Sequence, residues 1–280
     1  MKIMAITGPT SGIGEETFKS LISDFDQLFL LARNPKKAEE LIWKLPKSAK
    51  HKIVFVAVDL ADLTSVKHAA SIIREKAGHL DVLINNAGGI FSKKEITKDK
   101  LELTFQANHL GHFLLTMELM TLLLSASAPK VINVSSEAHR AGKVDFDDLQ
   151  FENKSYQSFL AYANAKLFNI WFTKSLVDHY GSKGLSAYAL HPGVVKTNFA
   201  KESSGIFNLF WKLASPFMID ASAGARTSIF LARTKLPASQ NGYYFKNRKV
   251  TKPSGLALNK EMREKFWIKS MELIKPFMGN

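Results

Sequence analysis

The fold of this chain is decided by Thr7-Gly8-Pro9-Thr10-Ser11-Gly12-Ile13-Gly14, a glycine-rich turn that directly follows an apolar run at residues 2–7. The run predicts a buried first strand, and a helical pattern begins at Gly12. Small residues between a strand and a helix N-terminus let backbone amides approach a phosphate. The stretch therefore predicts a dinucleotide cradle, with an ordinary strand-to-helix turn as the alternative. The expected contacts are Gly8, Thr10, Ser11, Gly12, Ile13 and Gly14.

Beyond this turn, short apolar runs alternate with longer helical patterns along the whole chain. Such alternation predicts an α/β protein, a Rossmann-type doubly wound parallel sheet of about seven strands with helices on both faces. No linker divides the sequence, so we expect one domain over residues 1–280. Strands are expected at 2–7, 27–32, 52–57, 80–84, 130–134, 185–190 and 242–245. Helices are expected at 12–23, 36–44, 63–76, 98–125, 159–180, 222–232 and 259–275.

Composition excludes several chemistries. There is no cysteine, so disulfides, thiolate metal sites and cysteine nucleophiles are ruled out. The run before the glycine turn is too short for the apolar region of a signal peptide. No uncharged apolar stretch reaches the ~18 residues of a membrane span. We therefore expect a cytoplasmic protein, and a peripheral membrane contact stays open.

The chain is strongly basic, with a formal net charge of +13. Basic residues cluster at 36–52 and 246–275. Such clusters can bind nucleic acid or an anionic membrane surface, or they can be solvated lysine faces. No nucleic-acid-binding motif accompanies the charge, so no nucleic-acid partner is expected. The oligomeric state stays open.

The end of the second strand bears on which dinucleotide binds. NAD-binding sheets place an acid there to hold the ribose 2′-hydroxyl, but this chain has Ala32 followed by Arg33 and Asn34. A planar guanidinium suits a 2′-phosphate, so we expect NADP (NADPH), with a strand-capping arginine as the alternative. At the end of the third strand, Asp59 and Leu60 are expected at the adenine edge.

A candidate reaction centre comes from four polar residues. Tyr162 and Lys166 are four apart in a helical pattern, so they share one face. A phenol must be tuned to exchange protons near neutrality, and a neighbouring ammonium favours the phenolate. Ser136 follows a predicted strand, and Asn108 lies within a helical stretch, where asparagine is unfavourable. Catalysis is the interpretation for all four, against a turn serine and a surface asparagine.

The ordered motifs resemble those of the short-chain dehydrogenase/reductase family. The glycine turn matches its TGxxxGxG, Asn85-Asn86-Ala87-Gly88 its NNAG, and Tyr162 to Lys166 its YxxxK. Segments 108–113 and 191–195 are similar to those of the retinol dehydrogenase-like branch. The resemblance implies a catalytic set of Asn108, Ser136, Tyr162 and Lys166. It adds nicotinamide-side contacts from Asn86, Ala87, Gly88, Tyr162, Lys166, Pro192, Val195 and Thr197.

The same resemblance implies an NADP-dependent oxidoreductase, a carbonyl reductase or alcohol dehydrogenase. A hydride would move between the nicotinamide and a small apolar aldehyde or ketone, or the corresponding alcohol. Tyr162 would donate the proton, Lys166 would lower its pKa and hold the ribose, and Ser136 would orient the carbonyl. Asn108 would hold a water that resupplies the proton. The alternative is a non-catalytic cofactor-binding regulatory protein of the same fold.

An apolar segment and four histidines are further candidates for function. The apolar, aromatic segment 206–219 corresponds to the family's substrate lid, near residues 200–220; a core helix and an interfacial membrane helix are the alternatives. Two histidines, His109 and His112, are three apart, and His139 and His191 lie near the predicted site, but no acidic partner has a suitable spacing for a metal. We therefore expect no metal site and interpret them as core or surface histidines.

Overall fold

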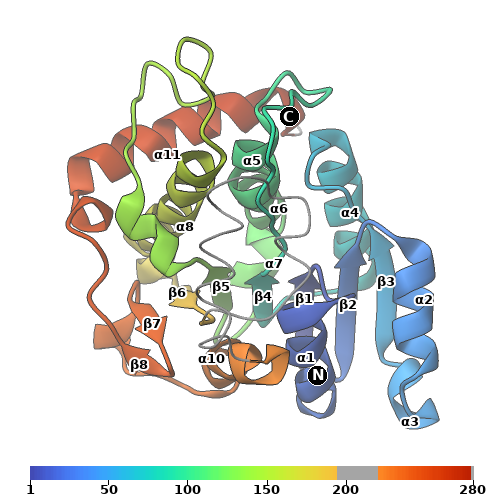
Figure 1. The fold of residues 1–280 in the computed structure, drawn as a ribbon. Helices are drawn as coiled ribbons and strands as arrows, with labels where there is room; N and C mark the ends of the chain where they lie inside the picture. Colours follow the sequence, from blue (N-terminus) through green and yellow to red (C-terminus); the bar gives the residue numbers. More distant parts are fainter. Residues whose placement is uncertain (194–219, 279–280) are drawn as a thin grey trace.

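The computed structural model describes residues 1–193 and 220–278. Within them the chain forms one eight-stranded sheet of order β3-β2-β1-β4-β5-β6-β7-β8 (Figure 1). Seven strands run parallel, and the eighth pairs antiparallel with β7. The strands are β1 (Ile3–Thr7), β2 (Gln27–Ala32), β3 (Ile53–Ala57), β4 (Val82–Asn85), β5 (Lys130–Val134), β6 (Ser186–His191), β7 (Tyr244–Lys246) and β8 (Lys249–Val250). The predicted doubly wound parallel sheet is confirmed.

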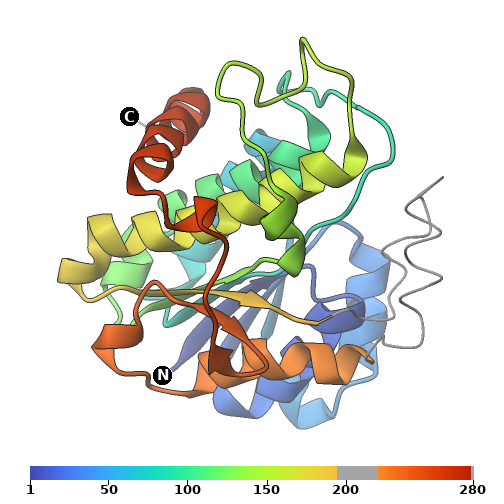
Figure 2. The ribbon, with the colours of Figure 1, turned by 60° about the vertical axis from the view of Figure 1, so that its left-hand side comes forward.

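Helices cover both faces of this sheet, as Figure 2 shows. One face packs against α4 (Leu63–Lys76) and α8 (Ser158–Tyr180), with α11 (Lys260–Ile274) lying outside α8. The other face packs against α1 (Gly12–Leu21), α2 (Pro35–Trp43) and α10 (Ala221–Arg233). Because both faces are covered, central strands such as β1 and β4 are buried along their whole length.

The structure differs from the prediction at the segment expected to be one helix, 98–125. It forms α5 (Leu103–Phe105), a π-helix η2 (Gln106–Leu110), α6 (Gly111–Glu118) and α7 (Met120–Leu124). The Glu102 carboxylate accepts hydrogen bonds from the backbone of Thr104 and Phe105, which starts the helix there. In the π-helix, the side-chain amide of Asn108 donates to the backbone carbonyl of Thr104 in α5, at 2.9 Å. Local side-chain bonds therefore start and reshape this helix.

Smaller differences lie at the surface. A four-residue helix, α3 (Lys47–Lys50), occurs before β3 and was not predicted. The two-residue strand β8 was also not predicted; it follows a tight turn in which Asn247 and Arg248 both have positive φ. Such a turn favours Asn-Gly, so an arginine at its second position gave no sequence signal.

The strand order determines where along the edge of the sheet a ligand can bind. The chain leaves β1 toward β2 on one side, and β4 pairs with β1 on the other. Ligands bind outside the carboxyl ends of parallel strands where the order reverses in this way. The glycine turn after β1 and the segment after β4 meet at that point.

Candidate active site

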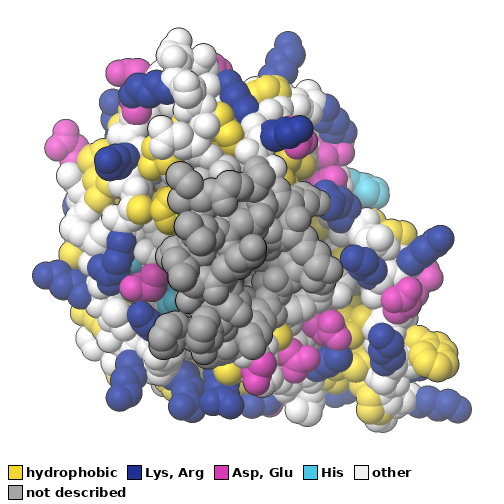
Figure 3. Space-filling model, in the orientation of Figure 1, with side chains coloured by type: hydrophobic (Ala, Val, Ile, Leu, Met, Phe, Trp, Pro, Cys, Tyr) yellow, Lys and Arg dark blue, Asp and Glu magenta, His cyan; other side chains and the backbone are white. Residues whose placement is uncertain are grey.

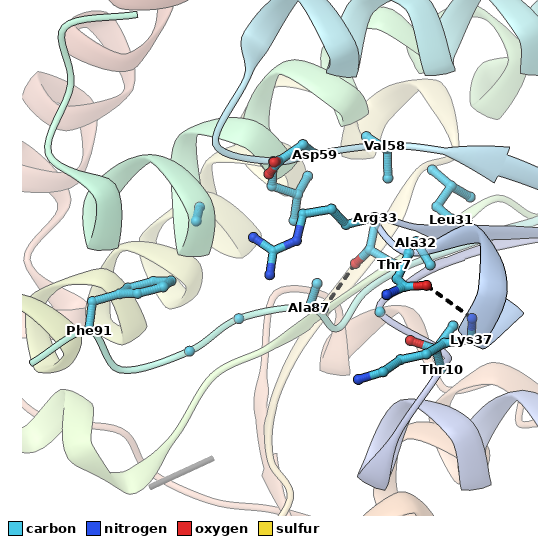
Figure 4. Close-up of a pocket in the computed structure, with 16 residues that line it drawn as sticks. Thr7, Thr10, Leu31, Ala32, Arg33, Lys37, Val58, Asp59, Ala87 and Phe91 are labelled. Atoms are coloured by element: carbon cyan, nitrogen blue, oxygen red, sulfur yellow. Dashed lines mark hydrogen bonds between the residues drawn. The ribbon is translucent and has the colours of Figure 1, made fainter. Parts of the chain in front are cut away.

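A cavity of about 300 Å³ lies at the carboxyl ends of β1 to β4 (Figure 4). Its walls come from the glycine turn, the ends of β2 and β3, and the segment after β4. The lining residues are Thr7, Gly8, Thr10, Leu31, Ala32, Arg33, Asn34, Lys37, Val58, Asp59, Leu60, Ala87, Gly88, Gly89, Phe91 and Ala107. Eight residues of the predicted cofactor set are among them: Gly8, Thr10, Arg33, Asn34, Asp59, Leu60, Ala87 and Gly88.

The other predicted turn residues do not line this cavity; Ser11 is the N-cap of α1, and Gly12, Ile13 and Gly14 form its first turn. Gly14 has a packing function, since an added Cβ would lie 2.2 Å from the Gly8 carbonyl oxygen. Gly8 itself has φ +66°, a conformation that favours glycine. The glycines let α1 approach the turn closely.

The Thr7 hydroxyl ties the turn to the segment after β4. It accepts hydrogen bonds from the backbone amides of Asn86 (2.9 Å) and Ala87 (3.0 Å). With both lone pairs used, its own proton must be donated, and His112 Nε2 lies 2.8 Å away. His112 is therefore protonated on Nδ1, which faces the Asn108 carbonyl at 3.3 Å. Burial lowers the His112 pKa to about 3, so the ring is neutral.

Asn86 lies just outside the cavity lining. Its side chain donates to the Thr7 and Gly8 carbonyls at 2.9 and 3.3 Å. A Cβ on Gly14 would lie 2.5 Å from this amide nitrogen. The NNAG segment therefore holds the glycine turn in place.

Cationic side chains gather at the end of β2. Arg33 and Lys37 are exposed, and Arg33 extends over the cavity between Asp59 and Ala87 (Figure 4). In the part of the chain that the structure describes, neither cation forms an ion pair. Asn34 caps α2 by accepting from the Lys37 amide at 3.1 Å. These cations are thus available to an anionic ligand.

Asn108 is fully buried and clamps the cavity wall. Its side chain both donates to the Gly89 carbonyl and accepts from the Gly89 amide, each at 3.0 Å. A Cβ on Gly88 would lie 2.5 Å from the Asn108 amide oxygen and 3.2 Å from Lys166 Nζ. The lysine ammonium therefore lies directly behind the residue that lines the cavity.

The two adjacent serines after β5 differ in their partners. The Ser135 hydroxyl is buried and donates to the Lys166 backbone carbonyl at 2.6 Å. The Ser136 side chain is half-buried and is hydrogen-bonded to Tyr162. Of the two, Ser136 is thus the one placed against the phenol.

Tyr162 and Lys166 lie on one face of α8, with the ammonium 5.4 Å from the ring centroid. Burial raises the pKa of Tyr162, and the Ser136 hydrogen bond opposes that rise. Burial lowers the pKa of Lys166 to about 8, and its ammonium donates to the Val134 carbonyl at 3.1 Å. Desolvation is therefore the larger influence on the Tyr162 pKa, and the hydrogen bond with Ser136 is the contribution that lowers it.

Several predictions fall elsewhere. Pro192 directly follows β6, whereas Val195, Thr197 and the segment near 200–220 lie outside the described residues. No group of metal-ligating side chains occurs within residues 1–193 and 220–278. His109, His112, His139 and His191 are all buried. Two of them contact catalytic candidates, His112 at the Asn108 carbonyl four residues before it and His139 at the Ser136 carbonyl three residues before it.

The surface charge is dispersed on the face that Figure 3 shows. Lys and Arg side chains lie around its periphery with Asp and Glu among them. This distribution resembles solvated lysine faces more than a nucleic-acid stripe. Of the helices that the structure describes, none is long and apolar enough to cross a membrane.

Comparison with known proteins gives consistent matches. The sequence profile of a family described as short chain dehydrogenase matches residues 2–205. Human retinol dehydrogenase 12 is 37% identical over 98% of this chain and 86% of its own length. An uncharacterized protein from Mycobacterium paratuberculosis has a similar structure, with a TM-score of 0.80 and 29% identity over 98% of this chain and 94% of that one. NADPH-bound carbonyl reductase from chicken fatty liver shares the fold, with a TM-score of 0.68 and 24% identity over 90% of this chain and 99% of that one.

Proposed function

The chain belongs to the short-chain dehydrogenase family and is an oxidoreductase; we propose that it is NADP-dependent and acts on an apolar aldehyde or ketone, or the corresponding alcohol. One observation carries this proposal. The Tyr162 phenol is hydrogen-bonded to Ser136, while the Lys166 ammonium lies against Gly88 in the wall of the cavity. This arrangement supports the proposal that a proton donor, a carbonyl-orienting hydroxyl and a cation act together beside a cavity lined by eight of the predicted cofactor contacts.

The cavity fits the cofactor through the chemistry of its walls. Gly8 and Thr10 offer a backbone approach for the pyrophosphate near the α1 N-terminus. Asp59, with Leu60 beside it, would accept from the adenine amino group. Asn86, Ala87 and Gly88 would flank the nicotinamide ribose, which Lys166 would hold. The predicted contacts that do not line the cavity would act from the N-terminus of α1, which approaches the glycine turn closely. They are Ser11, Gly12, Ile13 and Gly14.

In the proposed mechanism a bound nicotinamide supplies or takes the hydride. Ser136 donates a hydrogen bond to the carbonyl oxygen and orients it. Tyr162 gives its phenolic proton to that oxygen during reduction and takes it back during alcohol oxidation. Lys166 would stabilise the phenolate through the charge of its ammonium, which lies 5.4 Å from the Tyr162 ring centroid, and would hold the nicotinamide ribose. Asn108 keeps the wall behind Lys166 rigid through its two bonds to Gly89.

The preference for NADP rests on charge at the end of β2. Ala32 neither repels a 2′-phosphate nor accepts from a 2′-hydroxyl. Arg33 and Lys37 are exposed cations beside the cavity and have no ion-pair partner among the described residues. An uncompensated guanidinium is suited to bidentate phosphate binding. A single domain over 1–280, an apolar lid and a cytoplasmic location accompany this proposal as predictions.

The test is a screen of NADPH oxidation against apolar aldehydes and ketones, run with the wild type and Tyr162→Phe. The variant keeps the ring and loses the proton, so we expect kcat to fall by ~10²–10⁴ with cofactor affinity retained. Turnover by the variant at the wild-type rate would contradict the assigned proton donor. NADPH binding without turnover of any carbonyl would favour the non-catalytic alternative.

A further inference from the structure

A buried histidine lies directly behind the Ser136 loop. His139 belongs to η3 (Glu137–Ala141), the short helix capped by Ser136, and is 1% exposed. Its Nε2 is 3.1 Å from the backbone amide of Ser254. A backbone N–H can only donate, so Nε2 accepts and the ring proton sits on Nδ1. That Nδ1–H donates to the Ser136 carbonyl at 2.6 Å. His139 is thus the neutral tautomer with its proton on Nδ1, and each ring nitrogen has one hydrogen-bond partner.

The same loop is linked to the C-terminal part of the chain by further bonds. Arg140 donates to the Lys252 carbonyl at 2.8 Å, beside the His139–Ser254 contact. Four residues on, the Leu256 carbonyl accepts from the indole of Trp171 on α8, at 3.0 Å. Segment 252–256 therefore connects the loop that carries Ser136 with the helix that carries the phenol and the ammonium.

Two more buried rings hold this loop. The Tyr244 hydroxyl donates to the Glu137 carboxylate at 2.9 Å, and its ring lies edge-on to His139, 5.0 Å between centroids. The Glu137 amide donates to His191 Nδ1 at 3.3 Å. The peptide after Ser136 is thus fixed on both sides, and the Ser136 hydroxyl itself accepts from the Ala138 amide at 3.2 Å within the same loop.

We propose that His139 is a positioning residue for the oxidoreductase reaction: by binding the Ser136 carbonyl it fixes the Ser136 hydroxyl against Tyr162, and by accepting from Ser254 it ties that geometry to segment 252–256. This inference rests on the proposed function. The bond to Ser254 does not follow from a motif around the catalytic residues, since His139 and Ser254 are 115 residues apart.

The position of Ser136 bears on how the activity depends on pH. The Ser136 hydrogen bond lowers the pKa of Tyr162, so a displaced Ser136 should raise it. The other charged or titratable groups packed around this point are Lys166 on α8, Glu137 and Arg140 on η3, His191 on β6, and Tyr244 and Lys246 on β7. Of these, His191 and Tyr244 interact with the His139 ring itself, and because His139→Asn and His139→Gln both lose that ring, these two variants are compared with each other.

Two amide variants separate the two bonds. In His139→Asn the amide reaches the Nδ1 position and can still donate to the Ser136 carbonyl. In His139→Gln it reaches the Nε2 position and can still accept from Ser254. We expect His139→Asn to keep kcat within about twofold, and His139→Gln to lower it roughly three- to tenfold, the effect of one lost hydrogen bond.

The decisive readout is the pH profile of kcat for alcohol oxidation, where Tyr162 acts as the base. For His139→Gln the midpoint of this profile should rise by about half to one pH unit, and for His139→Asn it should equal that of the wild type. Crystal structures of both variants give a readout without turnover: the Ser136–Tyr162 hydrogen bond should persist in His139→Asn and be broken in His139→Gln.

Other outcomes would overturn the proposal. Equal kinetics and an unchanged midpoint for both variants, accompanied by lower thermal stability, would make His139 a packing residue only. An intact Ser136–Tyr162 bond in the His139→Gln crystal would do the same. Failure of the proposed function is distinct: the wild type would then turn over no carbonyl, while the two crystal structures would still decide what His139 holds.

Discussion

Arg33 shows how much a single residue decides. It stands one position after the place where an acid would hold a ribose 2′-hydroxyl, and it extends over the cavity without an ion-pair partner among the described residues (Figure 4). The sequence alone predicted this position. It did not indicate Phe91, which lines the same cavity from the loop after β4.

Exchanging this charge should change the preferred cofactor. The double change Ala32→Asp with Arg33→Ile introduces a carboxylate and removes the guanidinium. A charge-assisted hydrogen bond contributes about 1.5–3 kcal/mol, so NADP affinity should fall roughly ten- to a hundredfold while NAD affinity rises. Titration of both cofactors against both proteins measures this. Equal binding of NAD and NADP by the wild type would show that Arg33 is an ordinary surface cation.

The sequence was sufficient to predict which residues are catalytic candidates. It was not sufficient to predict the hydrogen bonds that hold them in place. Tyr162, Lys166 and Ser136 stand in a recognisable order. The position of the His112 proton, by contrast, follows from the two backbone amides that donate to the Thr7 hydroxyl. These bonds form only because β1 and the NNAG segment are adjacent in the fold. Contacts between distant segments leave no periodic signal in the sequence.

At the scale of elements, the strands were the most predictable part. The central strands are short apolar runs because both faces are buried, and their predicted positions agree closely with the structure. The break of segment 98–125 into α5, η2, α6 and α7 was not predictable. The segment contains the bond from the Asn108 side chain to the Thr104 carbonyl, and Gly111, where an added Cβ would lie 2.7 Å from the Leu60 carbonyl oxygen; both contacts appear only in the folded chain.

The contact between α1 and the glycine turn gives an element-scale prediction. In Gly14→Ala the new Cβ would meet the Gly8 carbonyl at 2.2 Å and the Asn86 side chain at 2.5 Å. We expect α1 to shift, a loss of about 1–3 kcal/mol in the free energy of unfolding, and weaker NADPH binding. Urea unfolding and a fluorescence titration of NADPH measure the two effects.

Gly78→Ala is the matched control, since nothing lies within 4 Å of its added Cβ and no unusual φ is required. It should leave both quantities close to those of the wild type. Wild-type NADPH affinity in Gly14→Ala would mean that the close approach of α1 to the turn is not needed for the cofactor.

Across the whole molecule, buried neutral histidines make stability depend on pH. Burial lowers the pKa of His109 and His112 to about 3 and of His191 to about 4. An unfolded histidine has a pKa of about 6.5, so the unfolded chain binds more protons between that pH and the folded values. Stability is therefore full above pH ~6.5 and falls below it, by up to about 1.4 kcal/mol per pH unit for each ring.

Urea unfolding at pH 7.5, 6.5 and 5.5 tests this dependence. The free energy of unfolding should fall between the last two points, although Glu102, whose pKa burial raises, works in the opposite direction. His109→Leu should make that slope shallower, because one of the four buried rings with a lowered pKa is removed. A free energy that stays constant from pH 7.5 to 5.5 would contradict the neutral, buried state of these histidines.

The central claim is that this cavity and the Ser136–Tyr162–Lys166 group together transfer a hydride. The most direct measurement uses NADPH with deuterium at both C4 positions of the nicotinamide, an apolar aldehyde that the enzyme accepts, and mass spectrometry of the alcohol formed. The account predicts one deuterium on the carbinol carbon with the wild type and almost none with Tyr162→Phe under the same conditions. A wild-type protein that binds the deuterated NADPH yet yields no deuterated alcohol from any aldehyde or ketone tested would contradict it.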